Sequence, residues 1–186
     1  MLDEQALEEF VFARYSHAGD QLFRMERLPL YDVPSQNSDR ESWLAGHVDT
    51  TDLEQWAEVL AADRRRGLVS RRVRVLSSDL TDDEAMSCHV ALPIVGRDQE
   101  VRILHRGEHP VPELLDHDYW VIETASGVVD VVRMIYSDGG AFLGAEVVPP
   151  AQHGRYLRER DLAWSIAEPF APWWNRHREL HRKTAA

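Results

Sequence analysis

Residues 119–147 read YWVIETASGVVDVVRMIYSDGGAFLGAEV, and this stretch decides the fold class. Three apolar-rich runs, at 119–124, 128–136 and 141–147, are separated by the short sequences Ala-Ser-Gly and Ser-Asp-Gly-Gly. Short connections that contain glycine are typical of β-hairpins. The stretch therefore predicts an antiparallel meander.

The rest of the chain alternates between strand and helix patterns. Alternation of apolar and charged residues predicts strands at 22–33, 69–76 and 101–105, and helical spacing with capping and stop residues predicts helices at 3–15, 39–45, 53–66, 81–91 and 156–166. The expected fold class is α+β, with a mostly antiparallel sheet of about five to six strands, helices packed on it and helical ends. Residues 1–170 are expected to form a single domain, and residues 171–186 a basic helical extension.

Composition and charge exclude several classes of protein. The formal net charge of −11 opposes broad binding to a phosphate backbone, although six arginines between positions 64 and 74 form a local basic patch. No run approaches the roughly 18 to 20 apolar residues of a membrane span, and the amino terminus is acidic rather than signal-like. A lone cysteine, Cys88, allows neither an internal disulfide nor a multi-thiolate zinc site. We expect a cytoplasmic protein with no membrane contact.

Charged residues recur on the expected strands opposite apolar ones. If the strands near 23, 73 and 102 share a sheet, one face collects Arg24, Glu26, Arg72, Arg74 and Arg102. One interpretation is a solvated face with cross-strand ion pairs, each worth about 0.2 to 1 kcal/mol. The other is a floor on which clustered guanidinium groups bind a carboxylate, a phosphate or an acidic partner. The sequence leaves both open.

The segment Asp118-Tyr119-Trp120 places a carboxylate beside aromatic surface. Given a shifted pKa, Asp118 is a candidate for acid–base chemistry, as is Glu26, and Trp120 is a candidate ligand contact. The plainer interpretation is a strand end with its aromatic rings in the core.

Three histidines, His105, His109 and His117, lie close together in sequence. Glycine and prolines between them predict a loop, where His-x-x-x-His spacing brings no pair to one face, so we expect no metal site. The nucleotide-binding and hydrolase motifs with glycine-rich signatures are missing from the sequence, and no cofactor is expected.

The carboxy-terminal segment 172–183 joins Trp173 and Trp174 to a run of basic residues. Two tryptophans carry large apolar surfaces that need cover. We expect them to pack on their own domain, and the alternative is a surface for a partner.

Seven short segments form a recognisable series when taken in their order along the chain. They are Phe-Arg-Met-Glu at 23–26 with Tyr31, Trp-Leu-Ala-Gly at 43–46, Arg-Arg-Val-Arg-Val at 71–75, Val-Arg-Ile-Leu at 101–104, Asp-Tyr-Trp at 118–120, Phe-Leu-Gly-Ala-Glu at 142–146 and Ala-Trp-Ser-Ile-Ala at 163–167. Together they resemble an actinobacterial family of unknown function, made of small acidic cytoplasmic proteins often encoded beside helix-turn-helix regulators. The resemblance implies a genomic neighbourhood and transfers no catalytic residue.

Two hypotheses about function follow. The first is a non-enzymatic binding or regulatory accessory protein, which acts through a protein partner such as a helix-turn-helix regulator or through an anionic small molecule held on the arginine-bearing face. The second is a small enzyme acting on an anionic or aminoacylated substrate, for example a tRNA-linked one within a biosynthetic cluster. RNA binding is disfavoured by the net charge, and oligomerisation stays open.

Overall fold

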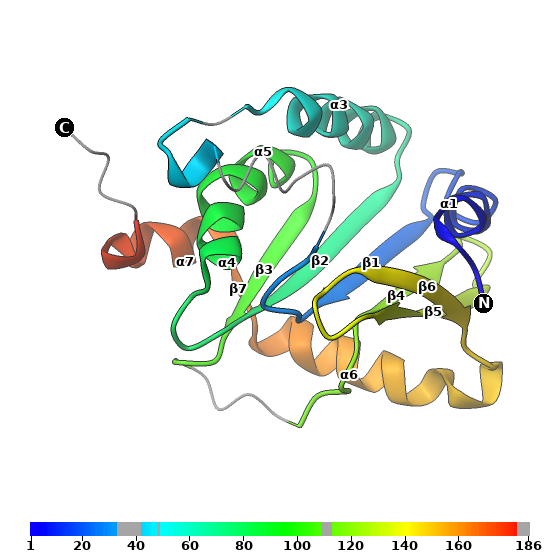
Figure 1. Ribbon diagram of the computed structural model, residues 1–186. Helices are drawn as coiled ribbons and strands as arrows, with labels where there is room; N and C mark the ends of the chain where they lie inside the picture. The colour runs from blue at the N-terminus through cyan, green and yellow to red at the C-terminus, as the bar shows by residue number, and fades with distance from the viewer. Residues whose placement is uncertain (33–41, 48, 109–112, 182–186) are drawn as a thin grey trace.

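The computed structural model describes residues 1–32, 42–47, 49–108 and 113–181. Its centre is a mixed sheet with the strand order β6-β5-β4-β1-β2-β3-β7 (Figure 1). The strands are β1 (Gln21–Glu26), β2 (Val69–Leu76), β3 (Glu100–His105), β4 (Tyr119–Glu123), β5 (Val129–Tyr136), β6 (Phe142–Val147) and β7 (Glu168–Pro169). Strands β1, β2 and β3 run parallel to one another, and the other pairings are antiparallel.

The α+β class and the mostly antiparallel sheet are confirmed, and the expected number of strands is wrong. The sheet has seven strands rather than five to six, because β7 is only two residues long and leaves no pattern in the sequence. The sheet is also partly parallel. Helices separate β1 from β2 and β2 from β3, and parallel neighbours need such crossovers, whereas antiparallel neighbours can be joined by a tight turn. The meander β4-β5-β6 is antiparallel as expected.

Helices cover both faces of the sheet (Figure 1). One face carries α1 (Glu4–Phe12) over the meander, and α3 (Thr51–Arg65), α4 (Asp82–Met86) and α5 (Leu92–Val95) over β2 and β3. The opposite face carries α6 (His153–Ile166). Beside β3 and β7 lies α7 (Phe170–Arg176), and short turns η3 (Pro150–Gln152) and η4 (Arg178–Leu180) complete the carboxy-terminal part.

The helix that begins after Thr81 shows how local sequence sets its start and how tertiary structure extends its end. The Thr81 side chain accepts a hydrogen bond from Glu84 N, and the Glu84 side chain accepts one from Thr81 N, which is a capping box. The sequence predicts that this helix ends or bends near Ala91, and it does not end there. The chain passes through a π-helical turn, η2 (Ser87–Ala91), and continues as α5, because Pro93 falls in the first turn of α5, where a missing N–H is tolerated. The helix expected at 39–45 begins outside the described residues, and 42–44 are helical.

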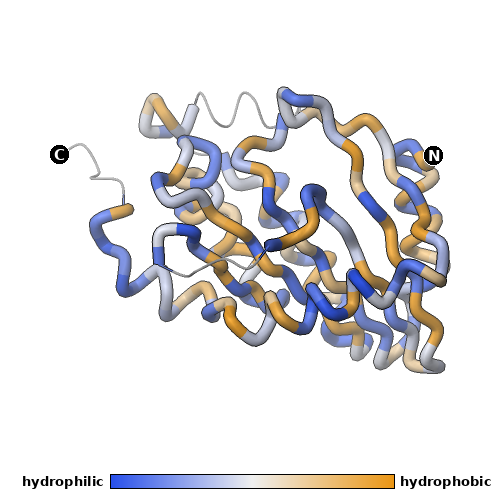
Figure 2. Tube along the Cα trace, turned by 90° about the horizontal axis from the view of Figure 1, so that it is seen from below, coloured by the Kyte–Doolittle hydropathy of each residue, from blue (hydrophilic) through white to orange (hydrophobic). Residues whose placement is uncertain are grey.

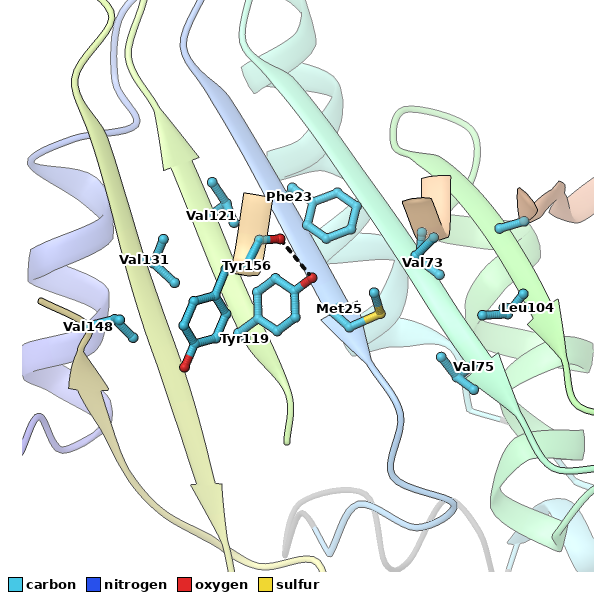
Figure 3. Packing of buried hydrophobic residues seen from close by; sticks show 12 residues of the cluster. Phe23, Met25, Val73, Val75, Leu104, Tyr119, Val121, Val131, Val148 and Tyr156 are labelled. Atoms are coloured by element: carbon cyan, nitrogen blue, oxygen red, sulfur yellow. Dashed lines mark hydrogen bonds between the residues drawn. The ribbon is translucent and has the colours of Figure 1, made fainter. Parts of the chain in front are cut away.

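The main hydrophobic core lies between the sheet and α6 (Figure 3). Phe23 and Met25 from β1 and Val73 and Val75 from β2 point into it, as the alternation predicts. Tyr119 packs edge-on against a tyrosine of α6 and donates a hydrogen bond to that residue's carbonyl oxygen at 3.3 Å. This core buries one face of β1 and of β2, so the alternate residues of these strands lie on the other face of the sheet.

That other side holds apolar clusters on either side of β1. One lies under α1 and contains Leu7, Val132 and Met134. Another lies under α3 and α5 and contains Leu76 and Ile103 with other buried apolar side chains. A further cluster around Ile122 packs against Leu22 of β1, whereas Arg24 and Glu26 of the same strand belong to none of these clusters. The candidate site lies beside these two residues.

No helix within the described ranges is long and apolar enough to cross a membrane. Figure 2 shows the same property along the chain, where hydrophobic stretches are short and interleaved with hydrophilic ones.

Candidate anion-binding site

Four of the charged residues expected on one face do come together. Arg24 and Glu26 on β1 and Arg72 and Arg74 on β2 line a cavity of about 490 Å³, together with Trp120 of β4. The register explains the meeting, because Arg24 lies opposite Arg72 on one side and opposite Trp120 on the other. A cavity of this size suits a small organic molecule.

Arg102 lies on the opposite face, so the expectation that it shares the surface is wrong. In the parallel pairing of β2 and β3, Arg102 is opposite Val73, a residue of the main core. The Arg102 guanidinium donates to the carbonyl oxygen of Trp164 at 2.8 Å and lies over the ring of that tryptophan. Its role is to fasten the end of α6 to the sheet.

Glu26 is the shared counter-ion of two arginines. Its Oε2 lies 3.3 Å from Arg72 Nη1, and its Oε1 lies 3.9 Å from Arg24 Nε. Burial alone would raise the pKa of Glu26, but the surrounding guanidinium groups, that of Arg72 foremost, hold it below its ordinary value. Burial lowers the pKa of Arg72 to about 10. Attraction to Glu26 acts in the other direction, and repulsion from the neighbouring guanidinium groups offsets part of that attraction. Two guanidinium groups, those of Arg24 and Arg72, therefore share the single negative charge of Glu26.

Two donors of this cluster lack acceptors. Arg24 Nε and Arg72 Nε are buried and have no hydrogen-bond partner among the described residues. The side chains of Arg24 and Arg72 are only 13% and 12% exposed, so water has little access to these N–H groups. Buried unpaired donors are costly and persist where function requires them.

Arg74 belongs to a more complete network behind the cavity. It is 2% exposed, donates to Tyr31 Oη at 3.4 Å, and its guanidinium lies 4.9 Å from the centre of the Tyr31 ring. Tyr31 in turn donates to Asp118, which also accepts a hydrogen bond from Arg27 N at 2.9 Å. Burial raises the pKa of Asp118 to about 6, with the charge of Glu26 acting in the same direction against the hydrogen bond from Tyr31.

Aromatic rings form the remaining wall. The guanidinium of Arg24 lies 5.1 Å from the centre of the Trp120 ring. Tyr31 packs edge-on against Tyr136, which packs in the same way against Phe142, and all three line the cavity. A ligand here meets cations at one end and flat apolar surface along its length. Sequence reasoning does not single out Tyr31 or Tyr136 as site residues, because their role depends on the fold of the segment after β1.

The histidines have other partners. His105 ends β3, where its Nε2 lies 3.1 Å from Ser78 O, and His117 contacts Asp116 and the hydroxyl of Tyr156. His109 is outside the described residues. Within the described part of the chain no group of three or more His, Cys, Asp or Glu side chains is arranged to hold a metal ion.

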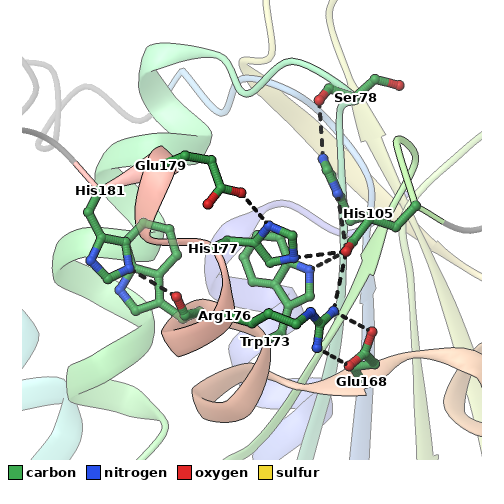
Figure 4. A network of polar contacts seen from close by, with 10 residues as sticks. Ser78, His105, Glu168, Trp173, Arg176, His177, Glu179 and His181 are labelled. Carbon is green, nitrogen blue, oxygen red and sulfur yellow. Dashed lines mark hydrogen bonds and ion pairs between the residues drawn. The ribbon is translucent and has the colours of Figure 1, made fainter.

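A second charged cluster includes Trp173, Arg176 and His177 (Figure 4), and these three side chains contact Glu108. Trp173 Nε1 donates to Glu108 at 2.7 Å, His177 Nε2 lies 2.8 Å from the carboxylate, and Arg176 donates to it at 3.3 Å. Burial would raise the pKa of Glu108, but these hydrogen bonds, that from Trp173 foremost, lower it to about 2. Trp173 itself is fully buried among apolar side chains.

Fold and site together describe an α+β protein whose aromatic-walled cavity has three arginines and four carboxylates among its described lining residues. The chain belongs to the family described as a domain of unknown function (DUF6879), whose model matches residues 9–175. No curated protein and no solved structure matches it.

Proposed function

We propose that the protein is a binding protein for a small anionic molecule, which it holds on Arg24 and Arg72 in the cavity beside β1. The single observation that carries the proposal is that these two buried guanidiniums share one counter-ion, Glu26, and keep unpaired N–H donors. A carboxylate or phosphate oxygen would satisfy both the missing hydrogen bonds and the missing charge.

The solvated-face interpretation fits the site less well. Exposed ion pairs leave their donors to water, whereas here the arginine side chains are almost nine-tenths buried. A purely structural cluster is expected to satisfy its donors internally. The unsatisfied donors favour a ligand.

In this proposal the binding event serves regulation. The resemblance to a family encoded beside helix-turn-helix regulators supports a cytoplasmic accessory role in an actinobacterium, in which the ligand changes the contact with a regulator protein.

The test is binding of small aromatic anions, benzoate and phenyl phosphate, measured by calorimetry. We expect binding to the natural protein and loss of at least about tenfold in affinity for Arg72→Gln, because charge-assisted hydrogen bonds contribute about 1.5 to 3 kcal/mol. Arg102→Gln is the matched control, since it removes the same charge from the opposite face and should bind normally. Equal weakening by both variants would show that only net charge matters and would refute the site.

An enzymatic role is the second candidate, and one observation favours it. Asp118 has a pKa raised to about 6 and is hydrogen-bonded to Tyr31, which lines the cavity. A carboxyl group that titrates near neutrality suits general acid–base catalysis through the tyrosine hydroxyl. If a substrate is turned over, Asp118→Asn should bind it normally and abolish turnover, whereas equal turnover by this variant would exclude Asp118 from the chemistry.

A further inference from the structure

The mouth of the cavity has the opposite charge to its floor. Three carboxylates line it, those of Asp49, Asp52 and Asp83, and the lining residues that the structure describes include no cation other than the three arginines. Asp49 and Asp52 are exposed and Asp83 is half-buried, so they lie toward solvent. The three arginines are more deeply buried than Asp49 and Asp52.

Helix termini account for part of this acidity but do not cancel it. Asp52 lies in the first turn of α3, and Asp83 in the first turn of α4, where acids favour helix formation. Each helix start carries about half a positive elementary charge, which is less than the full negative charge of the carboxylate beside it. The charge of Asp52 is therefore only partly offset, and Asp49, which accepts hydrogen bonds from Thr51, adds a second exposed carboxylate.

A simple anion matches only half of this arrangement. A polyphosphate would meet the arginines but bring repelling charge to the three carboxylates at the mouth. A molecule with an anion at one end and a cation at the other would match both ends. Between them, Trp56 and Trp120 offer apolar surface to its body.

Resting on the proposed function, we infer that the ligand is an elongated amphoteric molecule of the chemical class of a short peptide. Its carboxylate binds Arg24 and Arg72, its apolar body lies against the aromatic wall, and its ammonium group faces Asp52 and Asp49. The cavity volume of about 490 Å³ is in the range that encloses small organic ligands of this kind.

Three forms of one dipeptide test the two ends separately. Leucyl-phenylalanine carries both charges, its N-acetyl derivative lacks the ammonium group, and its amide lacks the carboxylate. Calorimetry on the full chain should give the tightest binding for the free dipeptide. We expect the N-acetyl form to bind about three- to tenfold more weakly, since the ion pair at the mouth is partly exposed, and the amide at least about tenfold more weakly.

Asp52→Asn is the decisive variant. It should remove the difference between the free and N-acetyl forms, while Glu54→Gln, a change in the same helical turn at a residue that does not line the cavity, should keep it. Equal binding of the free and N-acetyl forms to the natural protein would overturn the inference and leave the anion site intact. Equal binding of the amide and the acid would overturn the proposed function as well. If none of the three binds, the inference fails, and the aromatic anions alone decide the proposed function.

Discussion

Two charged clusters of this protein differ in how far they are satisfied from within. Around Glu108, a single carboxylate receives hydrogen bonds from Trp173 and Arg176 and lies close to His177, whose Nε2 has no hydrogen bond among the described residues; the pKa of Glu108 falls to about 2. In the cavity, two guanidinium groups share one carboxylate, and two of their N–H donors have no partner among the described residues. The pKa of Arg72 falls to about 10. The first cluster favours the ionised carboxylate of Glu108. In the second, burial opposes the charge of Arg72, while the guanidinium groups favour that of Glu26.

In our proposal, the difference separates a structural role from a binding role. Ionisation that the fold favours contributes stability, whereas ionisation that the fold opposes costs stability and needs another reason to persist. The Glu108 cluster fastens α7 to the end of β3. In our proposal, the arginine cluster holds its charge for a ligand.

The largest effect is expected at Trp173, on the structural side of the comparison. Its side chain is fully buried and its N–H donates to Glu108, so Trp173→Ala should lower the free energy of unfolding by about 3 to 5 kcal/mol in urea denaturation. Deletion of 172–186 should have a similar effect. If either change spares stability but abolishes self-association in sizing chromatography, the segment serves a partner instead.

Glu108→Gln should have the next largest effect. It removes the charge that attracts Arg176 and His177, and hydrogen bonds to an ionised group contribute about 1.5 to 3 kcal/mol. We expect a loss of about 2 kcal/mol in urea denaturation at pH 7. Glu179→Gln, which removes an exposed carboxylate that contacts the same histidine, is the control and should cost well under 1 kcal/mol. Equal losses in the two variants would mean that Glu108 has no special role.

The pH dependence of stability has opposite signs for Asp118, whose pKa is raised, and for Glu108, whose pKa is lowered. Because the pKa of Asp118 rises from 3.8 to about 6 on folding, the folded protein keeps a proton that the unfolded chain has lost between these values. This contribution is fully present below pH 4 and is lost as the pH rises through 6. Relative to the natural protein, Asp118→Asn should therefore gain stability across this interval, by about 1 to 3 kcal/mol. Urea denaturation from pH 4 to 7 measures it, and a constant difference would contradict the raised pKa.

The sequence predicts most elements but not how their faces combine. Alternation correctly separates the two faces within β2 and within β3. It does not fix which outward sets share a face, because a shift of one residue in register moves a whole strand to the other side. The pairing of Arg102 with Val73 rather than Arg72 or Arg74 is such a case, and only the fold decides it.

The site depends even more on tertiary structure. Arg24, Arg72 and Arg74 follow from alternation, but the cavity exists because α1 and α3 cover neighbouring parts of the sheet and leave β1 between them. Tyr31 reaches the site from an irregular segment after β1, and its short bond to Asp118 joins residues far apart in the sequence. No periodic pattern encodes such a contact.

The smallest change in stability should accompany the largest change in binding, at Arg72. The pKa of Arg72, lowered from 12.5 to about 10, corresponds to a cost on the order of 3 kcal/mol for keeping the guanidinium charged. The substitution Arg72→Gln removes part of this cost, but it also removes the ion pair with Glu26. The most direct test is therefore to measure urea denaturation and phenyl phosphate binding of Arg72→Gln and Glu108→Gln side by side. The account predicts that Arg72→Gln keeps or gains up to about 1 kcal/mol of stability and loses binding, while Glu108→Gln loses stability and binds normally once folded. If Arg72→Gln unfolds as readily as Glu108→Gln and natural protein binds no anion, the arginine cluster is structural and the account is wrong.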